Sequence, residues 1–322
     1  MSEARHWGDW AAAHAQVLSI ALFLVLACVL FGIGTEAFLS QGNLLNLLRQ
    51  AAPMLVVAVA MTFVITTGGI DLSVGSTVAL TSALVALALR AGIPWLLAVL
   101  GIVLLGAMIG AVQGWFVAMQ GIPSFIVTLA GLSVLRGVAL LLTQGYSIPI
   151  APGTFTAIGR GWWLGVPVPA VLALLVAAAG FVVLRRTRYG RQITATGANP
   201  EAARRVGMPV RRVIGSVYAV SGAASALAGL VIAGRLGSGS SNAAVGFELD
   251  VIAAVVLGGT SLAGGRGSVA GTVLGALTIA VIGNGLILAH VSPFFTQILT
   301  GAIILAAVWL NTRLFNRTPR KV

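Results

Sequence analysis

Asp71 stands out among the acids of this chain by its position. The sequence has seven acidic residues, and Asp71 lies between two apolar segments with no charged residue nearby. Such an acid can line a path or bind a coupling ion at a helix break. It can also cap the next helix by accepting the free N–H groups of Ser73 or Val74. The glycines at 68, 69 and 75 permit tight turns and favour the cap, and both interpretations allow this break to border a path.

Other residue types that carry out chemistry are scattered. The three histidines are far apart, and no residue set pairs a nucleophile with a base. His290 has no second histidine or acid at ligand spacing, so we expect no metal site. A phosphate-binding P-loop needs a lysine after its glycines, and the one lysine is Lys321, second from the end. We therefore expect no enzyme and no cofactor bound by this chain.

The loop at 185–212 is the second informative stretch. It carries eight arginines between apolar segments, and short loops this basic stay cytoplasmic. Within it, Asn199 can cap a helix, Pro200 suits the first helical position and Glu201 faces the positive helix end. Gly207 ends the helix after about two turns, roughly 10 Å. So short a helix melts in isolation, so we expect it to be ordered by docking; Ala202 and Ala203 are expected to keep its surface flat for a partner's groove.

The composition is that of a polytopic membrane protein. The 322 residues are 58% hydrophobic and 8% charged, with a mean hydropathy of +1.04. The net charge of +12 does not indicate nucleic acid, because the arginines gather in the central loop and the C-terminal tail, where membrane orientation explains them. The single cysteine, Cys28, lies in an apolar segment and is expected to pack as a small hydrophobic residue.

The sequence predicts an all-α membrane protein with about ten transmembrane helices. We expect one polytopic membrane domain over 1–322, with a cytoplasmic N-terminal tail at 1–16, a cytoplasmic loop at 185–212 and a cytoplasmic C-terminal tail at 311–322. The loop at 144–165 would then be external. Segment 249–263 is short for a crossing and is expected to be broken or re-entrant. The predicted spans are 17–34, 51–68, 73–90, 94–114, 122–143, 166–184, 213–233, 249–263, 268–289 and 292–310.

Glycines recur at helix-packing spacing and in two similar stretches. Small residues four apart, as at 106, 110 and 114 or at 267, 271 and 275, let helices approach closely in lipid. The stretch from Gly68-Gly69 to Ser76 resembles the stretch from Gly258-Gly259 to Ser268, and a Pro-x-Phe pattern at 123 recurs at 293. These likenesses indicate a possible internal repeat, parallel or inverted, of the kind that transporters use.

Three motifs in order carry a family resemblance. TTGGIDLSVGS at 66–76, ATGANPEAARRVGMPV at 195–210 and VLGGTSLAGGRGSVAGTVLGAL at 256–277 resemble the membrane permease subunits of ribose-type ABC importers, a branched monosaccharide group. The likeness runs from about 45 to 310. It implies about ten helices per subunit and an ATP-driven importer that carries a sugar (a pentose, hexose or related small polyol) across a bacterial inner membrane, with both termini cytoplasmic.

The resemblance also implies partners and site residues. The partners are a double-domain ABC ATPase that holds ATP and Mg, a periplasmic or extracellular sugar-binding protein, a second permease subunit in a homo- or heterodimer, and membrane lipid. The ATPase-coupling segment would comprise Asn199, Pro200, Glu201, Ala202, Ala203, Arg204 and Gly207. The candidates for residues beside the translocation path are Gly68, Gly69, Asp71, Ser73, Gly75, Gly258 and Gly259. The alternative is an ion-coupled secondary transporter that uses Asp71; a channel would leave the capped helix without a purpose.

Overall fold

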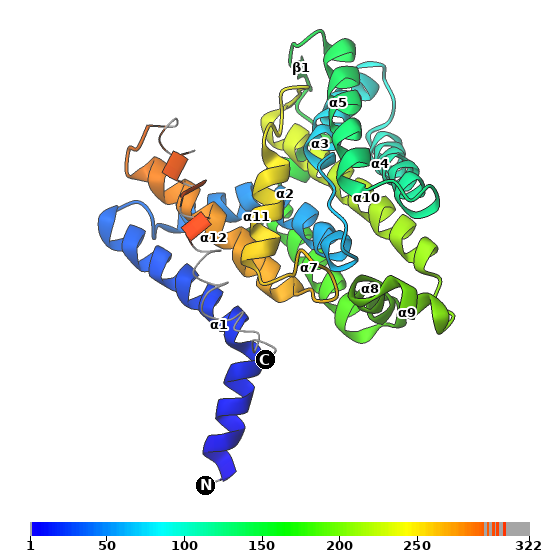
Figure 1. The fold of residues 1–322 in the computed structure, drawn as a ribbon. Helices are drawn as coiled ribbons and strands as arrows, with labels where there is room; N and C mark the ends of the chain where they lie inside the picture. Colours follow the sequence, from blue (N-terminus) through cyan, green and yellow to red (C-terminus); the bar gives the residue numbers. More distant parts are fainter. Residues whose placement is uncertain (1, 293–294, 296–297, 300, 303–304, 307–322) are drawn as a thin grey trace.

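The computed structural model describes residues 2–292, 295, 298–299, 301–302 and 305–306, and side chains from residue 17 onward. Most of this part of the chain is helical (Figure 1). Its helices are α1 (Ser2–Gly34), α2 (Gln41–Thr66), α3 (Val74–Arg90), α4 (Trp95–Met119), α5 (Ser124–Thr143), α6 (Ala157–Arg160), α7 (Val168–Arg186), α8 (Arg188–Ala198), α9 (Pro200–Arg205), α10 (Val210–Leu236), α11 (Phe247–Leu257) and α12 (Val269–Leu288).

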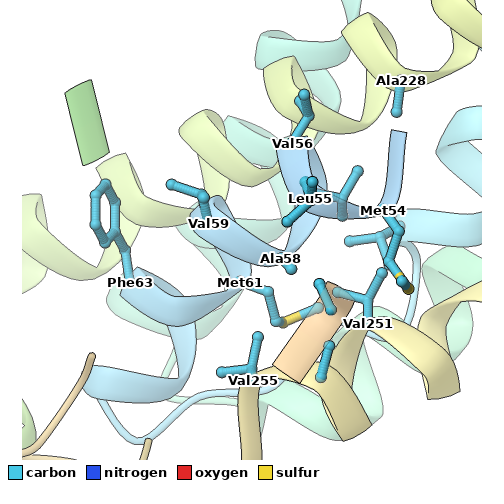
Figure 2. Close-up of a cluster of buried hydrophobic side chains, with 14 of the residues drawn as sticks. Met54, Leu55, Val56, Ala58, Val59, Met61, Phe63, Ala228, Val251 and Val255 are labelled. Carbon is cyan, nitrogen blue, oxygen red and sulfur yellow. The ribbon is translucent and has the colours of Figure 1, made fainter. Parts of the chain in front are cut away.

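Helix α2 is the centre of the packing. Every residue from Ala51 to Thr66 is buried, so this stretch is enclosed on all sides rather than on one stripe. Helices α7, α10, α11 and α12 all pack against it. Figure 2 shows its side chains, among them Met54 and Met61, beside Val251 and Val255 of α11. A long apolar segment can be surrounded in this way because it carries no polar face.

Helices α4 and α10 cross with almost no side chain between them. Gly106, Gly110 and Gly114 of α4 each leave no room for a Cβ against α10, at Gly222, Tyr218 and Gly215. In the second glycine series, Gly271 and Gly275 press against the backbone of α11 in the same way, at Gly258 and Ala254. The predicted packing role is therefore confirmed for these five glycines, whereas Gly267, the remaining glycine of the second series, leaves space for the Thr66 side chain.

The all-α membrane fold is confirmed, and the count of ten spans is not. Seven helices in the described residues are long and apolar enough to cross a membrane: the part of α1 from Val17, α2, α4, α5, α7, α10 and α12. Helix α3 is apolar but shorter, with 17 residues. Helix α11 has 11 residues, about 16 Å, which is shorter than a hydrocarbon core of about 30 Å. The predicted span 292–310 falls largely, and the tail 311–322 wholly, outside the described residues.

Small strands and turns form one end of the molecule. Strand β1 (Ile148–Pro149) pairs with β4 (Ser238–Gly239), and β2 (Trp162–Trp163) pairs with β3 (Val166–Pro167), both antiparallel. A 3₁₀ turn, η1 (Thr154–Thr156), leads into α6. In Figure 1 β1 lies at the opposite end of the body from α8 and α9. The predicted external loop at 144–165 is therefore an ordered cap on the face away from the arginine-rich loop.

The glycine crossing gives a matched test of packing. Gly110→Val should destabilise the protein by ~1–3 kcal/mol, because the added side chain meets the Tyr218 carbonyl. Gly101→Val lies on the same helix, has nothing within 4 Å of an added Cβ, and carries the same change in helix propensity. The thermal unfolding temperature in detergent should therefore fall for Gly110→Val and not for Gly101→Val. Equal melting of the two variants would contradict the packing role.

Candidate functional site

Helix α8 is held against the body of the protein by its own polar and apolar contacts. The Thr187 hydroxyl caps its start by accepting from the Gly190 N–H at 3.2 Å. Ile193 and Thr196 are fully buried, and the Tyr189 hydroxyl hydrogen-bonds Ser216 of α10 at 2.6 Å. Burial raises the pKa of Tyr189 above its ordinary value, so this hydroxyl stays protonated at neutral pH. Helix α8 is therefore docked firmly enough to order the short helix α9 that comes directly after it.

Helix α9 begins and ends as the sequence predicts. The Asn199 side chain accepts from the Ala202 N–H at 2.9 Å, and Pro200 is the first helical residue. Gly207 has φ +80°, and the N–H groups of Gly207 and Met208 donate to the carbonyls of Arg204 and Ala203, both at 3.0 Å. This paired pattern is a Schellman motif, which needs a left-handed residue at that point. Both ends of the helix are thus satisfied by local contacts.

The exposed side of α9 differs from the predicted one. Ala203 is only 4% exposed because it faces its own chain, so the expectation that it lies on the outer surface is wrong. Burial of one small residue is what seats a six-residue helix on its support. The outer surface is formed by Glu201, Ala202, Arg204, Arg205 and Val206, with Val206 at 72% exposure and a Glu201–Arg205 ion pair along it.

The last turn of α8 touches two segments that are far apart in the sequence. Gly197 leaves no room for a Cβ between the Thr66 carbonyl, at the end of α2, and the Gly265 N–H, in the α11–α12 connection. Those two groups hydrogen-bond each other at 2.9 Å. Gly264 has φ +81° and lies against Gly68 and the Gly197 carbonyl. The arginine-rich loop therefore lies directly on both glycine-rich breaks.

The two breaks begin with the same turn. Gly68 and Gly259 both have φ +84°, and each donates to the carbonyl three residues earlier at 2.9 Å. The next residue, Gly69 or Thr260, donates to the carbonyl five residues earlier, at 3.1 and 3.3 Å. These bonds match Gly68 with Gly259, so the sequence pairing of Gly68 with Gly258 was off by one residue. Gly258 instead provides room for the backbone of α12 at Gly271.

Asp71 is buried and fully hydrogen-bonded. Its exposure is 1%, and one carboxylate oxygen accepts from the Ser73 N–H at 3.0 Å and the Ser73 hydroxyl at 2.7 Å. The other accepts from the Ser221 hydroxyl, on α10, at 2.7 Å. The predicted contact with the Ser73 N–H is confirmed, whereas the link to α10 joins residues 150 apart in sequence. The carboxylate thus ties the break to the middle of a neighbouring helix.

The Ser73 hydroxyl also connects Asp71 to the Gln113 side chain of α4. The Ser73 hydroxyl lies 2.7 Å from Asp71 and 3.0 Å from the Gln113 side chain, and a hydroxyl has one proton to give. The Gln113 atom at that distance is Oε1, so the single hydroxyl proton is shared between this amide oxygen and Asp71 Oδ1, of which the carboxylate is the stronger acceptor. Gly131 of α5 leaves the space in which this amide lies. The break is therefore linked to α4 and α5 as well.

The backbone between the glycines and Asp71 is also satisfied from neighbouring helices. The Ile70 N–H donates to Ser124 at 3.2 Å, and the Ile70 carbonyl accepts from Thr128 at 3.2 Å and from Tyr218 at 3.4 Å. Gly69 has no side chain because the Tyr218 hydroxyl occupies that space. Such partners are required where a chain leaves helical structure away from water.

The connection from α10 to α11 descends along α3. Gly239 packs against the Ser82 carbonyl, and the Ala244 carbonyl lies where a Gly75 side chain would project. Ser82 and Gly75 are seven residues apart, about 10 Å along a helix. The connection thus brings the start of α11, which carries Glu248, beside the start of α3. The Glu248 carboxylate lies against Gly75, and its Oε2 is buried without a hydrogen-bond partner.

Arg136, on α5, is the residue at this junction that the sequence interpretation missed. Its guanidinium donates to the carbonyls of Ser241, Ala243 and Ala244 at 2.6, 2.8 and 3.3 Å, and it attracts Glu248 electrostatically. The available signal was a single charge in the otherwise uncharged segment 124–143. Among the described residues, no group of three His, Cys, Asp or Glu could hold a metal ion.

The comparison with known proteins identifies the family. Residues 43–308 match the model described as "Branched-chain amino acid transport system / permease component". The chain belongs to this permease family.

Curated relatives of this permease match along almost their whole lengths. The ribose import permease protein RbsC of Bacillus subtilis is 43% identical over 301 residues, with 92% of this chain and 93% of the relative covered. RbsC of Haemophilus influenzae is 42% identical over 295 residues, 90% of each chain. The xylose transport system permease protein XylH of Escherichia coli K12 is 36% identical over 357 residues, 91% of each. No solved structure matches.

Membership confirms the recognition made from the three motifs: the chain is a membrane permease subunit of the ribose-type ABC importers and not an enzyme. The relatives' names say nothing of which residues couple or line a path. Those assignments remain predictions.

The permease's buried carboxylate gives a test of the break. Asp71→Ala removes the acceptor of three hydrogen bonds and leaves buried donors on Ser73 and Ser221 unpaired, which should cost ~1–3 kcal/mol or more. Glu201→Ala, on the exposed face of α9, should stay within about 0.5 kcal/mol. Melting temperatures of the two purified variants are the measurement. A wild-type melting temperature for Asp71→Ala would contradict the structural role.

Proposed function

We propose that this permease is the membrane subunit of an ATP-driven importer that carries a sugar, of pentose, hexose or small polyol type. The relatives named for ribose and xylose support the sugar class. In this proposal two permease subunits, identical or not, enclose the translocation path, and an external sugar-binding protein delivers the substrate. The chain itself binds no cofactor; ATP and Mg are held by a separate double-domain ATPase.

The observation that carries the proposal is the placement of α9. Its ends are satisfied by Asn199 and Gly207, its inner face is anchored through Ala203, and its outer face is exposed. The adjoining turn of α8, at Gly197, lies on both helix breaks. We propose that the ATPase binds the outer face of α9, and that α8 transmits the motion of the ATPase to α2 and to the α11–α12 connection. Glu201, Ala202 and Arg204 are the contact residues of this segment.

The proposed path runs past the starts of α3 and α11. Helix α5 has three buried residues in its 20 and carries Arg136, so most of its surface is available to a path or a second subunit. Exposed Asn242 and Asp250 add polar groups suited to sugar hydroxyls. Among the sequence candidates, Asp71 and Ser73 are enclosed, and we assign them to holding the break. Gly75 borders the path through Glu248.

The proposed setting is the bacterial inner membrane with both termini cytoplasmic. The eight arginines of 185–212 support a cytoplasmic position for α8 and α9, because short basic loops stay cytoplasmic. The strand-bearing cap lies at the other end of the body and would receive the binding protein (Figure 1). Helix α11, too short to cross, then enters from the external face and turns back or joins α12 within the fold.

The ion-coupled alternative rests on Asp71 and has weaker support. A carboxylate that carries a coupling ion must release its partners in each cycle, and Asp71 has three hydrogen bonds at 3.0 Å or less. Its exposure of 1% leaves no open route to it. The alternative also assigns no purpose to the exposed, capped α9.

Bulk on the two faces of α9 should have separable effects. Ala202→Trp adds a side chain to the exposed face, so the permease should melt normally but lose ATPase co-purification and sugar uptake by about tenfold or more. Ala203→Trp instead overpacks the chain's own interior and should lower the melting temperature. Ala91→Trp, at the exposed turn after α3, is the control and should leave the melting temperature, ATPase co-purification and sugar uptake unchanged. Normal ATPase capture by Ala202→Trp would rule out a coupling role for α9.

The energy source is tested in proteoliposomes that hold the permease, its ATPase and the binding protein. Uptake should require hydrolysable ATP, stop with a hydrolysis-deficient ATPase, and persist when an ionophore collapses the proton gradient. Uptake by the permease alone, driven by an imposed ion gradient, would instead establish the secondary transporter.

A further inference from the structure

Three arginines gather at the end of the molecule opposite the coupling segment. Arg49 is on α2, Arg160 ends α6 and Arg235 is in the last turn of α10. The Arg160 Nε donates to the backbone carbonyl of Arg235 at 2.8 Å, and Gly159 leaves no room for a side chain against the Arg235 backbone. Arg49 is close enough to Arg235 for the two charges to repel. The fold therefore brings the charges of Arg49 and Arg235 together, and the Arg160 guanidinium contacts the backbone beside them.

No carboxylate offsets this charge within the described part of the chain. The one salt bridge there is Glu201–Arg205, at the other end of the molecule. The segments that supply the three arginines, 41–66, 144–167 and 210–236, contain no Asp or Glu at all. Clustered guanidinium groups without a counter-charge lower stability unless an anion binds them.

Two of the guanidinium groups also present buried donors that have no acceptor. The Nε of Arg49 and an Nη of Arg235 are inaccessible to solvent and make no hydrogen bond. Buried N–H groups of charged side chains are costly to leave unpaired, so they indicate where an acceptor belongs. Guanidinium groups fit phosphate oxygens in a two-point arrangement, which makes phosphate the best match in geometry and charge.

The surroundings of the cluster are those of a membrane interface. Arg49 lies over the Trp162 ring at 4.7 Å from its centroid. The β2–β3 hairpin also exposes Trp163 at 60% and Leu164 at 86%, and Trp is enriched where headgroups meet water. Helix α7 starts directly after this hairpin and exposes Leu174 and Leu175, at 69% and 65%. A phosphate bound here has apolar surface beside it, which suits acyl chains and offers nothing to a free ion.

We propose that Arg49, Arg160 and Arg235 bind the phosphate of an anionic phospholipid in the external leaflet, with its acyl chains along α7. The bound lipid joins α2 to α10 by neutralising the charges of Arg49 and Arg235, which otherwise repel, with Arg160 of α6 beside them. This site is independent of the proposed transport function, because it involves neither α9 nor the helix breaks.

The test is lipid retention and thermal stability of the purified, delipidated permease. In native mass spectrometry, wild type should retain phosphatidylglycerol about tenfold better than phosphatidylcholine, and phosphatidylglycerol should raise its melting temperature. Inorganic phosphate at equal concentration should do neither. The double variant Arg49→Gln/Arg235→Gln should lose about tenfold in phosphatidylglycerol retention. Arg90→Gln, an exposed arginine ending α3, is the matched control and should behave as wild type.

Several results would overturn the proposal. Equal retention of the two lipids by wild type would do so without any variant, and so would undiminished phosphatidylglycerol binding by the double variant. Stabilisation by inorganic phosphate as strong as that by lipid would make this a free-anion site. Loss of binding-protein capture in the double variant, with lipid retention intact, would assign the arginines to a protein contact.

Discussion

One hydrogen bond joins the parts on which this structure depends. The carbonyl of Thr66, freed where α2 ends, accepts the N–H of Gly265 from the connection between α11 and α12. A helix that stops away from water must give its last carbonyls to other donors, and this bond does so across 199 residues of sequence. Gly197 of α8 packs against both of these groups, so α8 contacts the end of α2 and the α11–α12 connection at one point. This meeting point fixes the end of α8 from which α9 continues.

The two glycine turns look alike but hold their following helices differently. Ser268 caps α12 by accepting from the Gly271 N–H at 3.1 Å. Ser73 precedes α3 at the corresponding place but makes no such cap, because its hydroxyl donates to Asp71. The carboxylate in turn reaches α10 through Ser221. The first break is thereby tied to α10 through a side chain, whereas the second has a local cap at Ser268 and reaches α2 through the backbone N–H of Gly265.

Interactions between residues close in sequence could be predicted, and those between residues far apart in sequence could not. Asn199 and Gly207 were correctly predicted as the start and stop of α9, because both act on backbone groups a few residues away. The contact of Asp71 with Ser73 is equally local, but nothing in the pattern indicated Ser221 as a partner. The burial of Ala203 depends on how α9 lies against its neighbours, so composition pointed to the wrong face. Hydropathy likewise predicted a span that begins at residue 51, whereas α2 begins at Gln41, because its first turns are polar yet helical.

The groups that fold α9 are separate from the surface that we propose binds the ATPase. The groups that shape the helix are a cap, a proline, a left-handed glycine and one buried alanine, while Ala202, Arg204 and Val206 point outward, away from the permease. In the proposed coupling role, a lineage could exchange one ATPase for another through a few surface substitutions, each almost free of folding cost. Importers with different motors can in this way evolve from one membrane scaffold, and engineered hybrids can be made by regrafting those side chains alone.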